Sequence, residues 1–78
     1  MKRVEFYVGV FNRDINEFKE FVNSINEIFP ENDHIELKNE FDDPDGYYTF
    51  TCVGSWETYE VCRQWPRLKS IEHFEDDN

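Results

Sequence analysis

The first stretch of the chain alternates apolar residues with others, which predicts a β-strand. A period of two is typical of a strand that buries one face. The polar triplet Asn12-Arg13-Asp14 interrupts the alternation, so we expect the strand to end there. The side chains predicted to face the core are Val4, Phe6, Val8 and Val10.

The next apolar residues recur at spacings of three and four, which predicts an amphipathic helix over residues 14–29. Asp14 is followed three positions later by Glu17, the spacing of a capping box, so we expect Asp14 to cap this helix. Pro30 ends it, because the residue before a proline disfavours the helical conformation. The predicted apolar stripe consists of Ile15, Phe18, Phe21, Val22, Ile25, Ile28 and Phe29.

A β-hairpin is predicted next, around the turn sequence Asp-Asp-Pro-Asp-Gly at residues 42–46. Proline fixes φ and an Asp-Gly pair tolerates positive φ, as a hairpin turn requires. Residues 47–53 are rich in aromatic and β-branched types, which predicts the returning strand. On the outgoing strand, residues predicted to face the core alternate with charged residues predicted to face outward: Ile35, Leu37 and Phe41 against Glu36, Lys38 and Glu40.

The last third of the chain predicts a second helix and a final strand. Ser55 is placed to cap a helix that runs from Trp56 to about Trp65 and directs Trp56, Tyr59 and Cys62 to the core. Pro66 ends this helix. For residues 69–74 both strand and helix are open, and we favour a strand over residues 71–74. Residues 75–78 are expected to form a frayed tail.

The resulting order, strand-helix-strand-strand-helix-strand, resembles the ferredoxin-like βαββαβ plan. We therefore predict that residues 1–78 form a single α+β domain, in which one antiparallel sheet carries both helices on one face. Within it we expect the first and third strands to be adjacent and parallel, joined by a right-handed crossover. Element order names a fold and no function.

Composition narrows the class of partner. The 78 residues include 18 acidic and 8 basic ones, giving a formal net charge of −10, beyond the magnitude of about 2–8 that suits solubility in a small domain. No apolar run is long enough to span a membrane, so we expect no membrane partner. The two cysteines, Cys52 and Cys62, are too few for a disulfide framework and are expected to be buried thiols of a cytoplasmic protein.

The charge also argues against nucleic acid as a direct ligand. Tyr7 and Tyr47 are predicted on the open face of the sheet, where related sheets bind RNA. Nucleic-acid binding depends on Lys and Arg, whereas this face is predicted to carry Glu5, Glu36 and Glu40 against Lys38. Tyrosines in that setting favour a protein interface.

No metal or cofactor site is predicted. With Gly46 at the sixth position of a calcium loop, Phe41 and Cys52 would stand where acidic ligands are needed. His34 and His73 have no cysteine at zinc-ligand spacing nearby. We therefore expect the Asp-rich segment to be a plain hairpin turn.

One segment suggests an enzyme. Residues 9–13, Gly-Val-Phe-Asn-Arg, resemble the phosphate-cradling loop of acylphosphatases, a family with the ferredoxin-like plan. The resemblance implies that Arg13 holds a phosphate and Asn39 orients the attacking water. The chain departs from the family at Val8, where the family has Gln, and at Asn12, where it has an aromatic residue. Asp14 and the net charge also oppose an anionic substrate, so hydrolysis stays an alternative and we expect no catalysis.

The favoured hypothesis is a binding protein that blocks a basic, nucleic-acid-binding surface of another protein. In composition, the chain resembles the small acidic inhibitors that phages and mobile elements make, including anti-CRISPR and anti-restriction proteins, some of which imitate the charge of DNA. A third hypothesis is a dimerisation or adaptor domain that uses the open sheet face, including a homodimer. The predicted contact residues are Asp42, Asp43 and Asp45 in the turn, with Tyr47 beside them, and Glu36, Glu40 and Tyr7 on the sheet.

Overall fold

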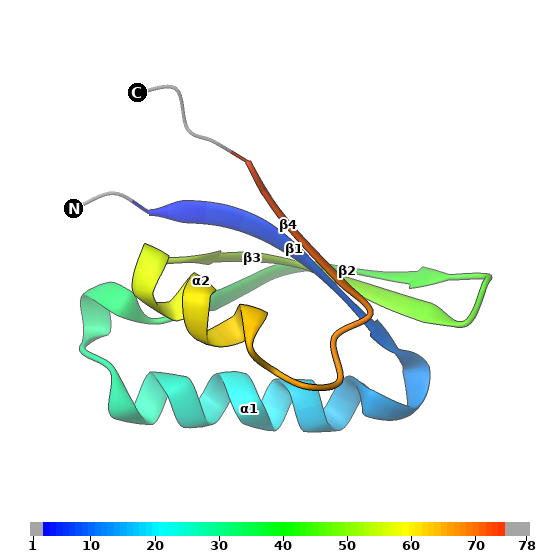
Figure 1. The fold of residues 1–78 in the computed structure, drawn as a ribbon, viewed down its shortest axis with the longest axis horizontal. Coiled ribbons are helices and arrows are strands. Elements are labelled where there is room, and N and C mark those ends of the chain that lie inside the picture. Colours follow the sequence, from blue (N-terminus) through cyan, green and yellow to red (C-terminus); the bar gives the residue numbers. More distant parts are fainter. Residues whose placement is uncertain (1–2, 75–78) are drawn as a thin grey trace.

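The chain forms one antiparallel sheet with both helices on the same side of it (Figure 1). The computed structural model describes residues 3–74. The strands lie in the order β2-β3-β1-β4, and each neighbouring pair is antiparallel. The fold is therefore α+β, and we call the sheet side turned away from the helices the open face. The elements are β1 (Val4–Phe11), the 3₁₀ turn η1 (Asn12–Asp14), α1 (Ile15–Ile28), the 3₁₀ turn η2 (Glu31–Asp33), β2 (Glu36–Asp43), β3 (Tyr47–Gly54), α2 (Trp56–Arg63) and β4 (Ser70–Phe74).

The direction of β3 corrects one prediction. β1 and β3 are neighbours but run antiparallel, with Phe6 opposite Cys52 and Val8 opposite Phe50, so the predicted parallel pair is wrong. β3 follows β2 through a tight turn, which reverses its direction, and it lies between β1 and β2. β1 and β2 therefore run the same way, and α1 connects these two.

The core forms where the apolar face of the sheet meets α1 and α2. The ring of Phe18 on α1 lies 4.9 Å from that of Phe50 on β3 and 5.5 Å from that of Trp65, measured between centroids. The alternation predicted for β1 is confirmed, since all its inward side chains are buried. The buried apolar residues are Val4, Phe6, Val8, Val10, Phe18, Val22, Ile25, Ile35, Phe50, Cys52, Tyr59 and Cys62.

Helix α1 ends at Ile28, before Pro30, as predicted. Ile28 is the exception in its apolar stripe, because its side chain is 79% exposed. At 3.6 residues per turn it lies about 80° around the helix from Phe18, and it is the last helical residue. The Ile28 side chain therefore lies beyond the edge of the core in which Phe18 and Ile25 are buried.

The start of α1 also differs from expectation. Asp14 occupies the cap position, but its side chain makes no capping hydrogen bond, so the predicted capping box with Glu17 is wrong. Instead the buried carboxylate of Asp14 lies 4.0 Å from Nε of Arg13 and 3.9 Å from a guanidinium nitrogen of Arg67. Arg67, from the connection between α2 and β4, thus pairs with the carboxylate that was expected to accept a backbone N–H of α1.

Helix α2 begins with the predicted cap. The hydroxyl of Ser55 accepts a hydrogen bond from the Thr58 amide, and the Thr58 hydroxyl accepts one from the Ser55 amide. Tyr59 is buried as predicted, but Trp56 is 40% exposed. Trp56 stands edge-to-face against His73 of β4 at 5.1 Å, at the margin of the core.

The final segment forms β4, in agreement with the predicted strand. His73, an exposed residue on the helix side of the sheet, joins α2 through a 2.9 Å hydrogen bond between Nδ1 and the hydroxyl of Tyr59. The predicted frayed tail, residues 75–78, lies outside the described residues. None of the helices within residues 3–74 is long and apolar enough to cross a membrane.

Candidate functional site

The β2–β3 hairpin turn gathers three aspartates at one end of the sheet. The amide of Gly46 donates to the carbonyl of Asp43 at 3.1 Å, and the amide of Asp45 donates to Oδ1 of Asp43 at 3.0 Å. Gly46 has a φ of 90°, which glycine adopts without strain. The predicted turn chemistry is confirmed, and it brings Asp42 and Asp43, the last residues of β2, and Asp45 close together around one short turn.

A further contact ties this turn to the rest of the sheet. The amide of Asn12 donates to the carbonyl of Gly46 at 3.3 Å, at the point where β1 passes into η1. Figure 1 shows the hairpin, in green, reaching past the helices at this end of the molecule. The acidic turn is therefore accessible and anchored at once.

The turn is negative because the basic side chains are engaged elsewhere. Among residues 3–74, no basic group lies within ion-pair distance of Asp42, Asp43 or Asp45. Ion pairs engage five other acids, namely Asp14, Glu17, Glu36, Glu40 and Glu60, whereas the three aspartates of the hairpin, which lie within four residues, have none among the residues that the structure describes. The basic side chains lie as follows: Arg3 and Lys38 by Glu36, Arg13 by Asp14, Lys19 by Glu40, Arg63 by Glu60, Arg67 by Asp14 and Glu17, and Lys69 over the ring of Tyr47.

Tyr47, the predicted aromatic neighbour of the turn, belongs to a small aromatic cluster. Its ring lies 5.4 Å from that of Phe11, and Nζ of Lys69 lies 4.9 Å from its centroid. The guanidinium of Arg13 lies 4.8 Å over Phe11 in the same way. Tyr47 thus borders the acidic turn, as predicted, but its half-buried ring already packs against neighbours.

A β-bulge in β2 changes which residues reach each face. Leu37 lies opposite Cys52 on the helix side, but the next pair is Asn39 opposite Thr51, so Lys38 is the extra residue. Because side chains alternate, one inserted residue moves everything after it to the other face. Phe41 therefore lies on the open face, 61% exposed, where the sequence pattern placed it in the core.

The same bulge moves Glu40 to the helix side. Its Oε1 accepts a 2.6 Å hydrogen bond from the Tyr48 hydroxyl and lies 3.4 Å from Nζ of Lys19 on α1. The hydrogen bond from Tyr48 lowers the pKa of Glu40 and raises that of Tyr48. Glu36 thus lies on the open face and Glu40 on the helix side. The prediction that Glu40 lies on the open face is wrong.

The open face has an uncharged centre, bordered by Glu5 and Glu72 on one side, by Glu36 with Arg3 and Lys38 on another, and by Lys69 over Tyr47 near the turn. Tyr7 lies there as predicted, between Thr51 of β3 and Glu72 of β4. The side chains of Tyr7, Phe41, Thr49 and Thr51 line a hollow of about 360 Å³. Sequence reasoning missed Phe41, because the bulge leaves no local signal, and it did not single out the two threonines of β3.

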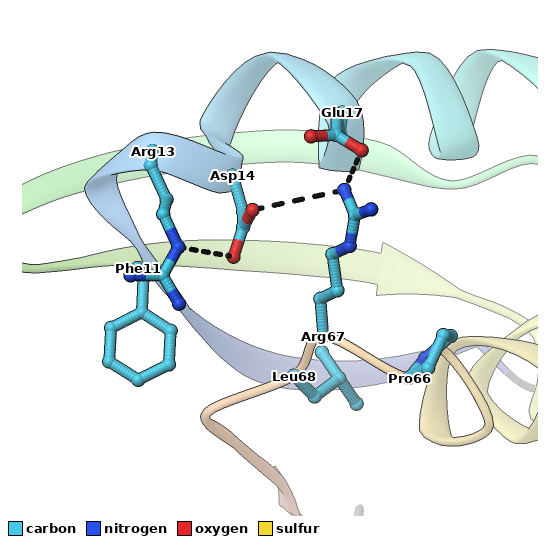
Figure 2. A pocket seen from close by; sticks show the side chains of 7 residues that line it. All are labelled: Phe11, Arg13, Asp14, Glu17, Pro66, Arg67 and Leu68. Atoms are coloured by element: carbon cyan, nitrogen blue, oxygen red, sulfur yellow. Dashed lines mark ion pairs between the residues drawn. The ribbon is translucent and has the colours of Figure 1, made fainter.

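A second pocket lies where the β1–α1 and α2–β4 connections meet. Figure 2 shows Arg67 reaching from the second connection toward Asp14 and Glu17, with which it forms ion pairs. The pocket measures about 490 Å³, and Phe11, Arg13, Asp14, Glu17, Pro66, Arg67 and Leu68 line it. Two arginines and two carboxylates balance, so this pocket carries no net charge.

The two residues of the acylphosphatase resemblance do not meet. Residues 9–11 belong to β1 and 12–14 to a 3₁₀ turn, so no open loop precedes α1. Asn39 is level with Tyr7 through Thr51, and Tyr7 is four residues before Phe11. At about 3.3 Å per residue this is roughly 13 Å along the strand, whereas Arg13 turns to Asp14 and Phe11.

The two cysteines are buried and their thiols are weakly acidic. Burial raises the pKa of the Cys62 thiol to about 12 and raises that of Cys52 as well, so both remain protonated and free. Within residues 3–74, no group of three or more His, Cys, Asp or Glu side chains is arranged to hold a metal ion. The ionised groups available for function are thus those of the surface.

Comparison with known proteins adds no relative. No protein-family model, curated protein or solved structure matches the chain.

Proposed function

We propose that this protein is a non-catalytic acidic domain that binds a basic, nucleic-acid-binding surface of another protein. The observation that carries the proposal is the uncompensated charge of the hairpin. Asp42, Asp43 and Asp45 have no ion-pair partner among the described residues, although Arg3, Lys19 and five further basic side chains lie within reach of acids or rings elsewhere.

The hydrogen bonds of the turn support this proposal. Carboxylates on a defined loop bind a cationic partner without the entropy loss that ordering a flexible loop entails. A basic groove that normally holds phosphates has the complementary charge, and attraction between the two surfaces speeds association. Direct binding of nucleic acid by this acidic hairpin is disfavoured by the same charge.

We infer further that the fold is ferredoxin-like and that the protein acts as an inhibitor of the anti-CRISPR or anti-restriction type, in the cytoplasm. The element order and the strand order β2-β3-β1-β4 support the fold. The net charge of −10 supports competition with nucleic acid. The free thiols of Cys52 and Cys62 suit a reducing compartment.

A competition experiment tests this function. Tagged protein captures its partner from the source cells, and the purified partner is then offered labelled double-stranded DNA with increasing amounts of this protein. We expect DNA to be displaced in proportion to the protein bound. A partner that holds DNA and this protein together would overturn the proposal and favour the adaptor hypothesis.

Matched charge variants separate the hairpin from the net charge. One variant carries Asp→Asn at residues 42, 43 and 45; the other carries Glu→Gln at Glu20, Glu27 and Glu31, exposed acids on and after α1. Both lose the same charge. We expect only the hairpin variant to lose DNA displacement, and equal loss in both would show that the location of the charge is irrelevant.

A further inference from the structure

We propose that the open face is a second contact surface, which takes an apolar side chain of a lysine- or arginine-rich segment of the partner into the hollow lined by Tyr7, Phe41, Thr49 and Thr51. The inference rests on the proposed function in one respect, that the partner is basic. It adds a site distinct from the three aspartates of the turn, with an anchor of different chemistry.

The bulge is the first argument. Without the extra residue at Lys38, Phe41 would follow Leu37 onto the helix side of the sheet. With it, Phe41 stands opposite Thr49 on the open face and is 61% exposed. The bulge thus leaves a large apolar side chain on the open face, and bulges often re-aim side chains at functional sites.

The hollow beside Phe41 is the second argument. Its volume of about 360 Å³ falls within the roughly 300–1,000 Å³ of ligand-binding pockets. Phe41 and the ring of Tyr7 supply apolar walls, and the threonine hydroxyls supply hydrogen-bonding groups. A pocket with a buried anchor and polar margins is the usual centre of a protein interface.

Two glutamates beside the hollow, unpaired within residues 3–74, favour a basic occupant. Glu72 lies opposite Tyr7 on β4, and Glu5 is two residues from Tyr7, on the same face of β1. In the described part of the chain neither glutamate has an ion-pair partner. A basic segment gains from both glutamates, whereas a second copy of this chain or a nucleic acid would bring like charges against them.

An NMR titration with defined peptides tests the proposal. The probes are a lysine-flanked peptide with a central leucine, the same peptide with a central alanine, and a glutamate-flanked peptide with a central leucine. We expect the first to shift the amides of Phe41, Thr49 and Thr51. The alanine peptide should bind about tenfold more weakly, since part of the buried hydrocarbon is missing, and the acidic peptide should not bind.

Two variants locate the contact. Phe41→Thr keeps strand propensity and removes an exposed side chain outside the core, and it should weaken the leucine peptide about tenfold. The hairpin variant with Asn at 42, 43 and 45 should leave the open-face shifts in place. Leucine-peptide binding that Phe41→Thr leaves unchanged would overturn the open-face site and leave the hairpin function standing.

The competing occupants give opposite results. Single-stranded oligothymidine that shifts Phe41, Thr49 and Thr51 would overturn the proposal in favour of nucleic acid. Self-association in sedimentation, lost in Phe41→Thr, would overturn it in favour of a homodimer. We expect a monomer that ignores the oligonucleotide. One further result would contradict this second site. It is that the leucine peptide shifts no open-face amide of the wild type and fails to bind the hairpin variant.

Discussion

The hydroxyl of Tyr48 donates a 2.6 Å hydrogen bond to Oε1 of Glu40, the same carboxylate oxygen that lies 3.4 Å from Nζ of Lys19. Tyr48 and Glu40 stand on adjacent strands of the hairpin, and Lys19 belongs to α1. This cluster exists only because the bulge at Lys38 turns Glu40 toward the helices. The cluster therefore lies on the side of the hairpin that faces α1.

The first prediction concerns titration of this pair. The Tyr48 hydrogen bond holds the pKa of Glu40 below its ordinary value of 4.5, so Glu40 stabilises the fold above its unfolded pKa, and this is lost as the pH falls through the lowered value. For Tyr48 the pKa is raised, so its contribution is complete below 10 and is lost as the pH rises through the raised value.

Tyr48→Phe should therefore raise the pKa of Glu40, measured from the carboxyl carbon shift by NMR. Tyr47→Phe is the matched control, because the Tyr47 ring lies against Phe11 and Lys69 instead. An unchanged Glu40 titration in Tyr48→Phe would contradict the described pair.

The second prediction concerns the core. Phe18 is 0% exposed and touches Phe50 and Trp65, so Phe18→Ala should lower the free energy of unfolding by about 3–5 kcal/mol. Ile28→Ala on the same helix, at a residue 79% exposed, should change it by no more than about 0.5 kcal/mol. Urea denaturation measures both, and similar losses at the two positions would refute the packing of α1.

The third prediction concerns the cap of α2. Ser55 is buried and accepts the Thr58 amide, so Ser55→Ala should cost about 1 kcal/mol of unfolding free energy. Ser24→Ala, at an exposed position inside α1, should be neutral or slightly stabilising because alanine favours helices. Thermal unfolding of the two variants distinguishes them, and a neutral Ser55→Ala would mean that the cap does not form.

The fourth prediction concerns the hairpin turn. Gly46 has a φ of 90°, a conformation that costs an L-residue with a Cβ roughly 1–2 kcal/mol. Gly46→Ala should therefore lower the unfolding free energy by about that amount, and Gly46→Asn by less, because asparagine tolerates positive φ. Chemical denaturation gives both values. Equal effects of Ala and Asn would show that backbone conformation is not the cause.

Local chemistry predicted most elements of the fold. Alternation placed the core face of β1, Pro30 placed the end of α1, and Ser55 placed the start of α2. Gly46 indicated the positive φ of the turn. Each of these signals depends on residues within one element, which is why sequence alone was sufficient.

Features that depend on pairing between distant segments could not be predicted in this way. Leu37 and Phe41 are four residues apart, a spacing that puts both on one face of a regular strand, so only the pairing with β3 reveals the bulge. Asp14 and Glu17 have capping-box spacing, but Arg67, at least fifty residues later in the chain, engages both carboxylates. The same holds for the candidate site. The acidic turn was predicted from local sequence, and the hollow at Phe41, which depends on strand pairing, was not.

The central claim is that the hairpin carboxylates bring the protein to a basic partner, and the association rate against salt tests it most directly. Ionic strength is raised from about 0.01 M to about 0.15 M, which shortens the Debye length from about 30 Å to about 8 Å. Wild-type association with the captured partner should slow about tenfold or more over this range. The variant with Asn at 42, 43 and 45 should associate slowly throughout, and the matched variant at Glu20, Glu27 and Glu31 should resemble wild type. A rate that is indifferent to salt and identical in both variants would contradict the account.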